Sequence, residues 1–358
     1  MTRNRVKSKQ KIHWRFYAVP SFFACCLFLI HCFANQKDQN EIDDFKIKTL
    51  PPYTRDQFHV QLVSINRKSG IEDSLSLYDA VEKNNIALVR NLLNAGADPE
   101  SVMSSQKENL IPPLLEAVYQ NNEQMALLLL RHRANPNRKA IEGDRPLCAT
   151  RSIKIAKLLL EYGADIHLQG FHHKVGSYTP LYASVFQASN GADVLMQHKI
   201  ASYLFEKGGN LNARVGREGW TVLMEEAGNG APEYIDEWIK RGANVNQYTK
   251  SGFSSLMFAA EAGMNENMEM LLMHGAKINH LTNHKLSALM LAAEHGDPGT
   301  IKLLLRWGAN IELKDSNRKT ALDHALAEDN PAVAKLLLKE GKKRKQHPTK
   351  ISFENLSD

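Results

Sequence analysis

The feature that most restricts the fold of this chain is a pattern that returns at a fixed spacing. Residues 287–311 read SALMLAAEHGDPGTIKLLLRWGANI, and residues 254–278 read SSLMFAAEAGMNENMEMLLMHGAKI. The glycine near the end of each copy marks the period, and the last steps between these marker glycines are 34, 33, 33 and 33 residues. A period of roughly 20 to 50 residues is typical of solenoids and repeat arrays. The chain is therefore expected to consist of stacked copies of one small unit.

Less regular copies of the same unit precede these. The marker positions are Gly96, Arg133, Gly163, Gly208, Gly242, Gly275, Gly308 and Gly341. They predict about eight units between residues 73 and 345. The first apolar segment begins 21 residues before the marker in six units, 18 before it in the third and 29 before it in the fourth. Because a residue that ends a helix here is expected to be left-handed, which favours glycine, Arg133 is predicted to be strained.

Each unit contains two short apolar segments with helical spacing. In the copy at residues 287–311, Leu289 and Ala292 share one face of the first segment, and Ile301 and Leu304 line the second. Isolated helices of about ten residues are marginal in water. Such units are expected to fold only by burying their apolar faces against their neighbours.

The opening segments of the units identify the type of repeat. They read TPLYAS, RPLCAT, TVLMEE, SSLMFAA, SALMLAA and TALDHAL. With the leucine pairs and Gly-Ala endings that follow, they resemble the ankyrin repeat and its T-P-L-H-x-A…L-L…G-A-D pattern, over about three quarters of the chain. The resemblance implies an all-α ankyrin-repeat solenoid of about eight helix-turn-helix units with hairpin-like loops. It also implies a non-enzymatic protein–protein interaction module.

The chain departs from the family pattern in two ways. The family's histidine at the fourth position of the segment is replaced by Tyr78, Leu115, Cys148, Tyr182, Met224, Met257, Met290 and Asp323. In addition, Glu226 stands where the family has a buried alanine. An unpaired buried carboxylate is costly, so we expect a partner for Glu226 or a local shift of its helix. Cys148, the single cysteine outside the N-terminal segment, is interpreted as buried and inert.

The N-terminal segment has the composition of a targeting signal. Six of the 45 lysines and arginines lie in the first 34 residues, and the remaining 39 equal the 39 acidic residues, which argues against a nucleic-acid partner for the repeats. The 21 residues 16–36 are uncharged. A secretory signal peptide cleaved after Ala34 is the first interpretation. A membrane anchor formed by residues 16–36 and a lipoprotein modified at Cys32 are the alternatives.

These observations divide the chain into four parts. They are residues 1–34, a signal peptide or membrane anchor; 35–72, a linker and N-terminal cap; 73–345, the repeat domain; and 346–358, a C-terminal tail. The fourth unit carries extra residues before Thr179 and, in the stretch VFQASNGADVLMQHK, between its helices. These insertions belong either to a binding face or to tolerated variation of surface loops. The basic run 342–345 is interpreted as part of a solvated tail.

The sequence contains no convincing catalytic constellation. A phosphate-binding glycine loop and the motifs H-E-x-x-H, G-x-S-x-G and C-x-x-C are all missing. His167, His172 and His173 share one loop, but adjacent histidines of an extended segment point to opposite sides and do not converge on a metal. We therefore predict that the protein is not an enzyme and has no cofactor and no metal site.

The residue that precedes each opening segment is the best candidate for partner binding. In ankyrin repeats this position lies near the tip of the loop between repeats, beside the concave surface, and here it holds Tyr178, Trp220, Phe253 and Leu286. Protein interfaces concentrate such aromatic anchors, although a large side chain here can equally pack on neighbouring loops. Flanking polar candidates, taken from the family's variable positions, are Arg217, Glu218, Lys250, His284, Glu261, Glu294 and His295.

The sequence thus predicts an exported ankyrin-repeat protein of the bacterial type, periplasmic or secreted. We expect it to bind an unknown protein partner through its loop tips and concave face, as a monomer. No nucleic-acid partner is expected, and the membrane is involved only through the N-terminal segment. A membrane-anchored envelope scaffold and a secreted effector acting in a host cell are the alternative functions.

Overall fold

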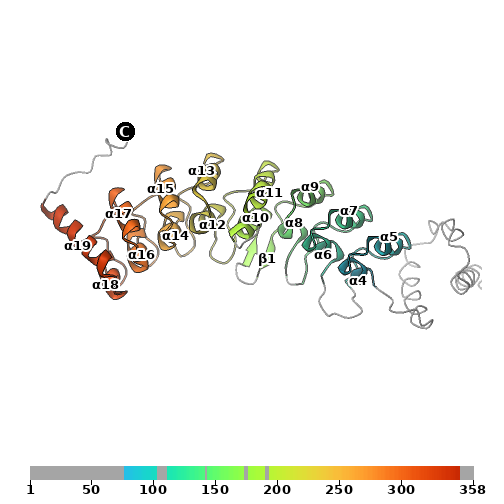
Figure 1. The fold of residues 1–358 in the computed structure, drawn as a ribbon, viewed down its shortest axis with the longest axis horizontal. Helices are drawn as coiled ribbons and strands as arrows, with labels where there is room; N and C mark the ends of the chain where they lie inside the picture. The colour runs from blue at the N-terminus through green and yellow to red at the C-terminus, as the bar shows by residue number, and fades with distance from the viewer. Residues whose placement is uncertain (1–75, 103–110, 142, 173–175, 190–192, 347–358) are drawn as a thin grey trace, which may run out of the picture. The chain divides into compact units, whose positions relative to one another are not determined.

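The computed structural model describes residues 76–102, 111–141, 143–172, 176–189 and 193–346 (Figure 1). These residues contain sixteen helices and one two-stranded antiparallel hairpin. All of them belong to one compact unit, Ile65–Asp358. The signal peptide, anchor, lipoprotein, linker and N-terminal cap predicted for residues 1–72 lie outside the described residues, as does most of the tail.

The helices follow one another in pairs. The first helices of the pairs are α4 (Leu77–Glu82), α6 (Pro113–Tyr119), α8 (Pro146–Ala149), α10 (Pro180–Ser189), α12 (Val222–Asn229), α14 (Ser255–Glu261), α16 (Ala288–His295) and α18 (Ala321–Ala327). The second helices are α5 (Ile86–Asn94), α7 (Glu123–Arg131), α9 (Ile153–Glu161), α11 (Val194–Glu206), α13 (Pro232–Lys240), α15 (Asn265–Met273), α17 (Pro298–Arg306) and α19 (Pro331–Gln346). Each first helix contacts the first helix of the next pair. Figure 1 shows the second helices from α5 to α17 in a row along one side of the stack, so the predicted all-α solenoid is confirmed.

Local sequence signals determine where the helices begin and end. The hydroxyl oxygens of Thr221, Ser254 and Ser287 each accept the backbone N–H three residues later, which caps α12, α14 and α16. After each second helix before α19 the chain turns through a left-handed residue, such as Gly242 with φ +102°. The last marker glycine, Gly341, lies inside α19 instead, so the left-handed turn expected there is absent. Arg133 adopts φ +69° in the same position, so the expected left-handed conformation is confirmed, and its strain stays a prediction.

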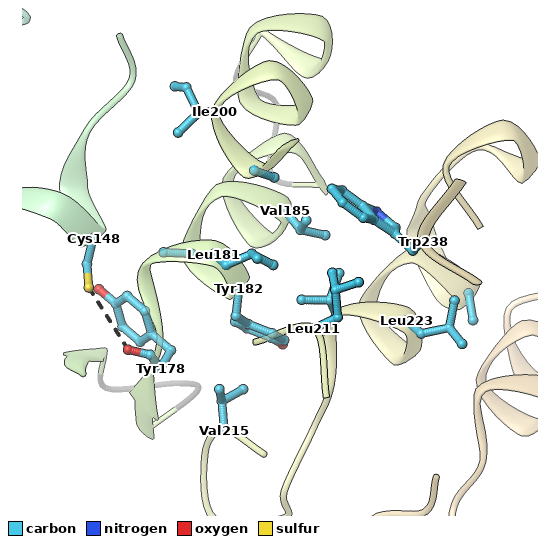
Figure 2. Packing of buried hydrophobic residues seen from close by; sticks show 14 of the residues in the cluster. Cys148, Tyr178, Leu181, Tyr182, Val185, Ile200, Leu211, Val215, Leu223 and Trp238 are labelled. Atoms are coloured by element: carbon cyan, nitrogen blue, oxygen red, sulfur yellow. Dashed lines mark hydrogen bonds between the residues drawn. The ribbon is translucent and has the colours of Figure 1, made fainter. Parts of the chain in front are cut away.

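The core runs along the stack between the two rows of helices. Small residues at the ends of the opening segments, such as Ala259, Ala260 and Ala292, are fully buried and let successive helices approach closely. Trp238 of α13 is among the largest fully buried side chains, and Figure 2 shows it beside the apolar core residues of the neighbouring units. Burial of these faces on adjacent units supplies the stability that a single short helix pair lacks.

Asparagines in the loops after the marker glycines join one unit to the next. Asn246 Nδ2 donates to Gly275 O at 3.0 Å, and its Oδ1 accepts from Lys277 N at 2.9 Å. Asn137, Asn212 and Asn279 make the equivalent bonds to their following loops. The corresponding position between the third and fourth units holds His167, which has no side-chain amide to continue this series.

The third and fourth units deviate from the rest. Helix α8 has only four residues, which accounts for the short third unit. In the fourth unit the extra residues do not all lie in the connection between the helices, as the sequence suggested, because α10 and α11 themselves extend to 10 and 13 residues. The longer preceding loop forms a hairpin of β1 (Gly170–His172) and β2 (Gly176–Tyr178), in which Gly170 pairs with Tyr178.

The last helix is longer than expected. Residues 342–345, interpreted from the sequence as part of a solvated tail, continue α19 to Gln346, so their backbone is helical. The final unit exposes Asp323, Glu328 and Lys335, as a polar terminal unit should. Among the described helices, none is both long and apolar enough to cross a membrane.

Candidate partner-binding surface

The loops before α12, α14 and α16 form a connected series of tips. Each begins and ends in a hairpin-like arrangement, as in the antiparallel bridge between Val215 and Trp220. Backbone hydrogen bonds join each tip to the next, so the tips hold one another in place. These bonds run from Lys250 N to Glu218 O (2.8 Å), from Asn283 N to Ser251 O (3.0 Å) and from Ser316 N to His284 O (2.9 Å).

Three of the predicted apolar anchors lie along this series. Trp220, Phe253 and Leu286 are each half-buried and pack on the core with part of their surface. The rings of Trp220 and Phe253 both pack against Phe258 of α14, with centroid distances of 4.4 and 5.6 Å. These residues therefore pack on the core and keep an accessible face, and their contact with a partner stays a prediction.

The fourth predicted anchor, Tyr178, is placed differently. Its side chain is only 8 % exposed, and its hydroxyl donates to the carboxylate of Asp144. The same carboxylate accepts from the hydroxyl of Tyr119 at 2.7 Å. Tyr178 lies on strand β2, in the hairpin inserted before the fourth unit. Its side chain therefore packs within the structure and is not an exposed anchor.

The polar candidates all reach the surface. The side chains of Arg217, Glu218, Lys250, His284, Glu261, Glu294 and His295 are exposed. The first four lie at the loop tips, and the last three lie at the C-terminal ends of α14 and α16. Glu294 Oε1 lies 2.7 Å from Nδ1 of His324 on α18, so part of its charge is directed to the next unit.

A hollow of about 200 Å³ lies between α12 and α14. It is lined by Trp220, Met224, Gly228, Asn229, Phe258, Glu261 and Ala262. Two of the predicted site residues, Trp220 and Glu261, thus meet at one place. The sequence did not identify the hollow, because its lining residues come from two successive units that meet only when the helices pack.

A buried polar cluster lies behind this surface, on the side of the fourth unit. Glu226 of α12 is 1 % exposed, and its Oε1 lies 2.6 Å from Nε2 of His198 on α11. Trp238 Nε1 donates to the same oxygen at 3.1 Å. The ring of Tyr234 stacks on that of His198, with centroids 3.3 Å apart. The expected partner for Glu226 is therefore present, and it lies in the lengthened helix of the irregular unit.

The hydrogen bonds of His198 determine where the proton lies. Its Nδ1 faces the carbonyl oxygen of Val194 at 2.9 Å, which can only accept, so Nδ1 carries a hydrogen. Nε2 then needs a second proton to bond an ionised Glu226. Burial alone lowers the pKa of His198, but the hydrogen bond and charge of Glu226 more than offset this, so the pKa lies above its ordinary value. The pair is therefore a buried ion pair when His198 is protonated.

The remaining candidate chemical groups are inert or dispersed. Cys148 is buried, and this burial raises the pKa of its thiol to about 12, so it stays protonated and unreactive as predicted. In the part of the chain that the structure describes, no group of three or more His, Cys, Asp or Glu side chains is placed to hold a metal ion. Of the three loop histidines, His167 is exposed and His173 lies outside the described residues.

Stacked helix pairs with linked loop tips define a repeat protein that presents an extended, preorganised surface. A family model described as Ankyrin repeats (3 copies) matches residues 77–170, 194–282 and 256–347, which together make up more than half of the chain. The chain therefore belongs to the ankyrin repeat family. A search of curated proteins found no match. Ankyrin repeats generally mediate protein–protein interactions and are typically not enzymes.

Proposed function

We propose that this protein is a non-enzymatic protein–protein interaction module of about eight ankyrin repeats, exported across a membrane. Its partner-binding surface comprises the loop tips and first helices from Arg217 to His295. The partner is a protein, and the module acts as a monomer without nucleic acid, cofactor or metal.

The observation that carries this proposal is the linked series of loop tips. Because each tip is hydrogen-bonded to the next through the backbone, little conformational entropy is lost when a partner docks there. Half-buried Trp220 and Phe253 offer aromatic surface beside exposed charges at Arg217 and Lys250. This combination of rigid aromatic anchors with a polar rim is typical of protein interfaces. A standard interface takes about 800 Å² from each partner, an area that a few adjacent repeats supply.

Site-specific photo-crosslinking tests the location of the surface. A photoreactive amino acid replaces Lys250 or Glu261 on the proposed surface, or Lys302, an exposed residue of α17, as the control. In cells of the source organism we expect a discrete protein adduct from the first two positions and none from Lys302. Adducts formed only at Lys302, or at none of the three positions, would contradict the proposal.

Export rests on residues 1–36, with their basic start and uncharged centre. Fractionation of cells that express the full chain with a C-terminal tag, followed by mass measurement, tests it. A soluble species that starts at Asn35 supports a cleaved signal peptide. A membrane-bound species of full length supports instead an anchored envelope scaffold, and a species that starts at a lipid-modified Cys32 supports a lipoprotein. A full-length cytoplasmic species would refute export.

A further inference from the structure

We propose that the hollow between α12 and α14 binds a single arginine side chain presented by the protein partner. This inference rests on the proposed function, since it concerns one subsite of the same surface. Four features of the hollow support it: its aromatic wall, its unpaired carboxylate, the helix ends around it and the glycine that opens it.

The aromatic wall consists of Trp220 and Phe258. Their rings are inclined at 33° with centroids 4.4 Å apart, and both remain partly exposed. Cations bind to such faces, and Trp binds them best. Within the described residues, the lysines and arginines that lie over rings do so at Tyr203, Phe205 and Trp238, and none covers the two rings of the hollow.

The carboxylate is that of Glu261, the last residue of α14. It is exposed, lines the hollow and forms no ion pair with any described residue. Across the hollow, Asn229 donates its amide to Glu225 Oε1 at 3.3 Å. An ionised carboxylate beside aromatic faces suits a planar guanidinium, which can stack on a ring while it donates two hydrogen bonds to the acid.

The backbone around the hollow favours a positive charge as well. Gly228 and Asn229 are the last residues of α12, and Glu261 is the last residue of α14. The C-terminal ends of helices carry partial negative charge from their free carbonyl groups. At the end of α12 the amide of Asn267 offsets part of this charge, since its Nδ2 donates to Glu226 O and Ala227 O at 3.3 and 3.2 Å. The remaining charge of the helix ends and the carboxylate of Glu261, which lines the hollow, both favour a cation there.

Gly228 makes room for the ligand. A Cβ atom at this position would have only the Cβ of Phe258 near it, at 4.0 Å. The residue is helical, where glycine is less stable than alanine by about 0.5–1 kcal/mol. A side chain here would enter the hollow without a clash against the backbone, so this position provides a way to fill the subsite and leave the fold intact.

The test begins with peptides selected from a random phage-displayed library on the full chain. We expect the enriched peptides to share an arginine, and replacement of that arginine by glutamine to weaken binding by roughly tenfold or more. Gly228→Leu, which fills the hollow, and Glu261→Gln should also weaken the wild-type peptide. Glu312→Gln, at an exposed loop position away from the hollow, is the matched control and should leave the Kd unchanged.

The outcomes separate this inference from the proposed function. Peptides that bind the surface with equal Kd to wild type and Gly228→Leu overturn the arginine subsite and leave the interaction module standing. Enriched peptides whose essential residue is apolar, or a library that yields no arginine-dependent binder, also overturn it. Replacement of the arginine in the peptide by glutamine tests the subsite on the wild-type protein, so the test holds even where a protein variant fails to fold. The photo-crosslinking experiment tests the proposed function independently of the hollow.

Discussion

His198 on α11 places its Nε2 atom 2.6 Å from Oε1 of Glu226 on α12, so a buried ion pair joins the irregular fourth unit to the fifth. Glu226 stands where an ankyrin repeat has a small apolar residue, and Trp238 supplies its second hydrogen bond. Burial of two charges is costly, and only close geometry with further hydrogen bonds compensates for it. The stability of the contact between these two units therefore depends on both residues together.

A double-mutant cycle measures this dependence. His198→Leu leaves the carboxylate of Glu226 buried with Trp238 alone and should lower the free energy of unfolding by about 3–5 kcal/mol. Glu226→Ala restores the family's residue and should cost less, about 1–3 kcal/mol, because a neutral His198 tolerates the loss. The free energy of unfolding of the double variant should lie within about 1 kcal/mol of the wild-type value, or exceed it. Urea denaturation checks this, and strictly additive single effects would contradict it.

The same pair should make stability depend on pH. The pKa of His198 is raised in the folded protein, so the folded state holds a proton that the unfolded state has lost. Its contribution is fully present below the unfolded value of about 6.5 and is lost as pH rises through the folded-state pKa. Besides Glu226, the charge of Glu237 favours the protonated ring, and Tyr234 stacks on it.

Unfolding of wild type and of the double variant His198→Leu/Glu226→Ala, measured at several pH values from about 6 to about 9, checks this dependence. Titrations elsewhere in the chain are common to both proteins and cancel in the comparison. Wild type should lose stability relative to the double variant as pH increases. A difference that stays constant over the range, or one that grows in favour of wild type, would refute the assignment of the proton to His198.

Two neighbouring glycines should respond in opposite ways to alanine. At Gly230 an added Cβ would lie 1.8 Å from Oε2 of Glu226, whose side chain is held by His198 and cannot move without breaking the ion pair. Gly230→Ala should therefore destabilise by about 1–3 kcal/mol. Gly228→Ala, in open space within a helix, should stabilise by about 0.5–1 kcal/mol. Thermal unfolding followed by circular dichroism measures the stability of both variants. Changes of the same sign in the two would contradict this prediction.

Arg133 offers a test of backbone strain. It is exposed and adopts φ +69°, where the other units place glycine. Arg133→Gly should raise the free energy of unfolding by about 1 kcal/mol. The matched control is Gly308→Ala: its φ is +89° and no atom lies within 4 Å of the added Cβ, so only the backbone contributes. It should destabilise by about the same amount. Chemical denaturation of both variants decides whether strain or side-chain contacts govern this position.

The unusual acid could be recognised in the sequence, whereas its partner could not. Glu226 was identifiable because it falls at a fixed position of a regular unit, where the periodicity predicts burial. His198 lies in the fourth unit, whose altered spacing removes the register that would assign it a face. The extra residues there lengthen α10 and α11, and this shift brings His198 to the acid.

The predicted partner-binding surface was likewise only partly predictable from the sequence. Trp220, Phe253 and Leu286 could be placed at loop tips because each precedes a regular opening segment, and they lie there. Tyr178 precedes a similar segment, but the hairpin of β1 and β2 encloses it. Pairings between distant segments, such as that of Gly170 with Tyr178, are not encoded by local spacing.

The repeated sequence pattern therefore predicted the helix pairs, their caps and the left-handed turns of all units but the last, because those features depend on residues within a few positions of one another. Tertiary structure decided which side chains of different units meet. Gly228 and Phe258 border the hollow, and His198 and Glu226 pair, only after the helices stack. The distances between units depend on helix length and packing, which the local repeat pattern does not specify where its spacing breaks.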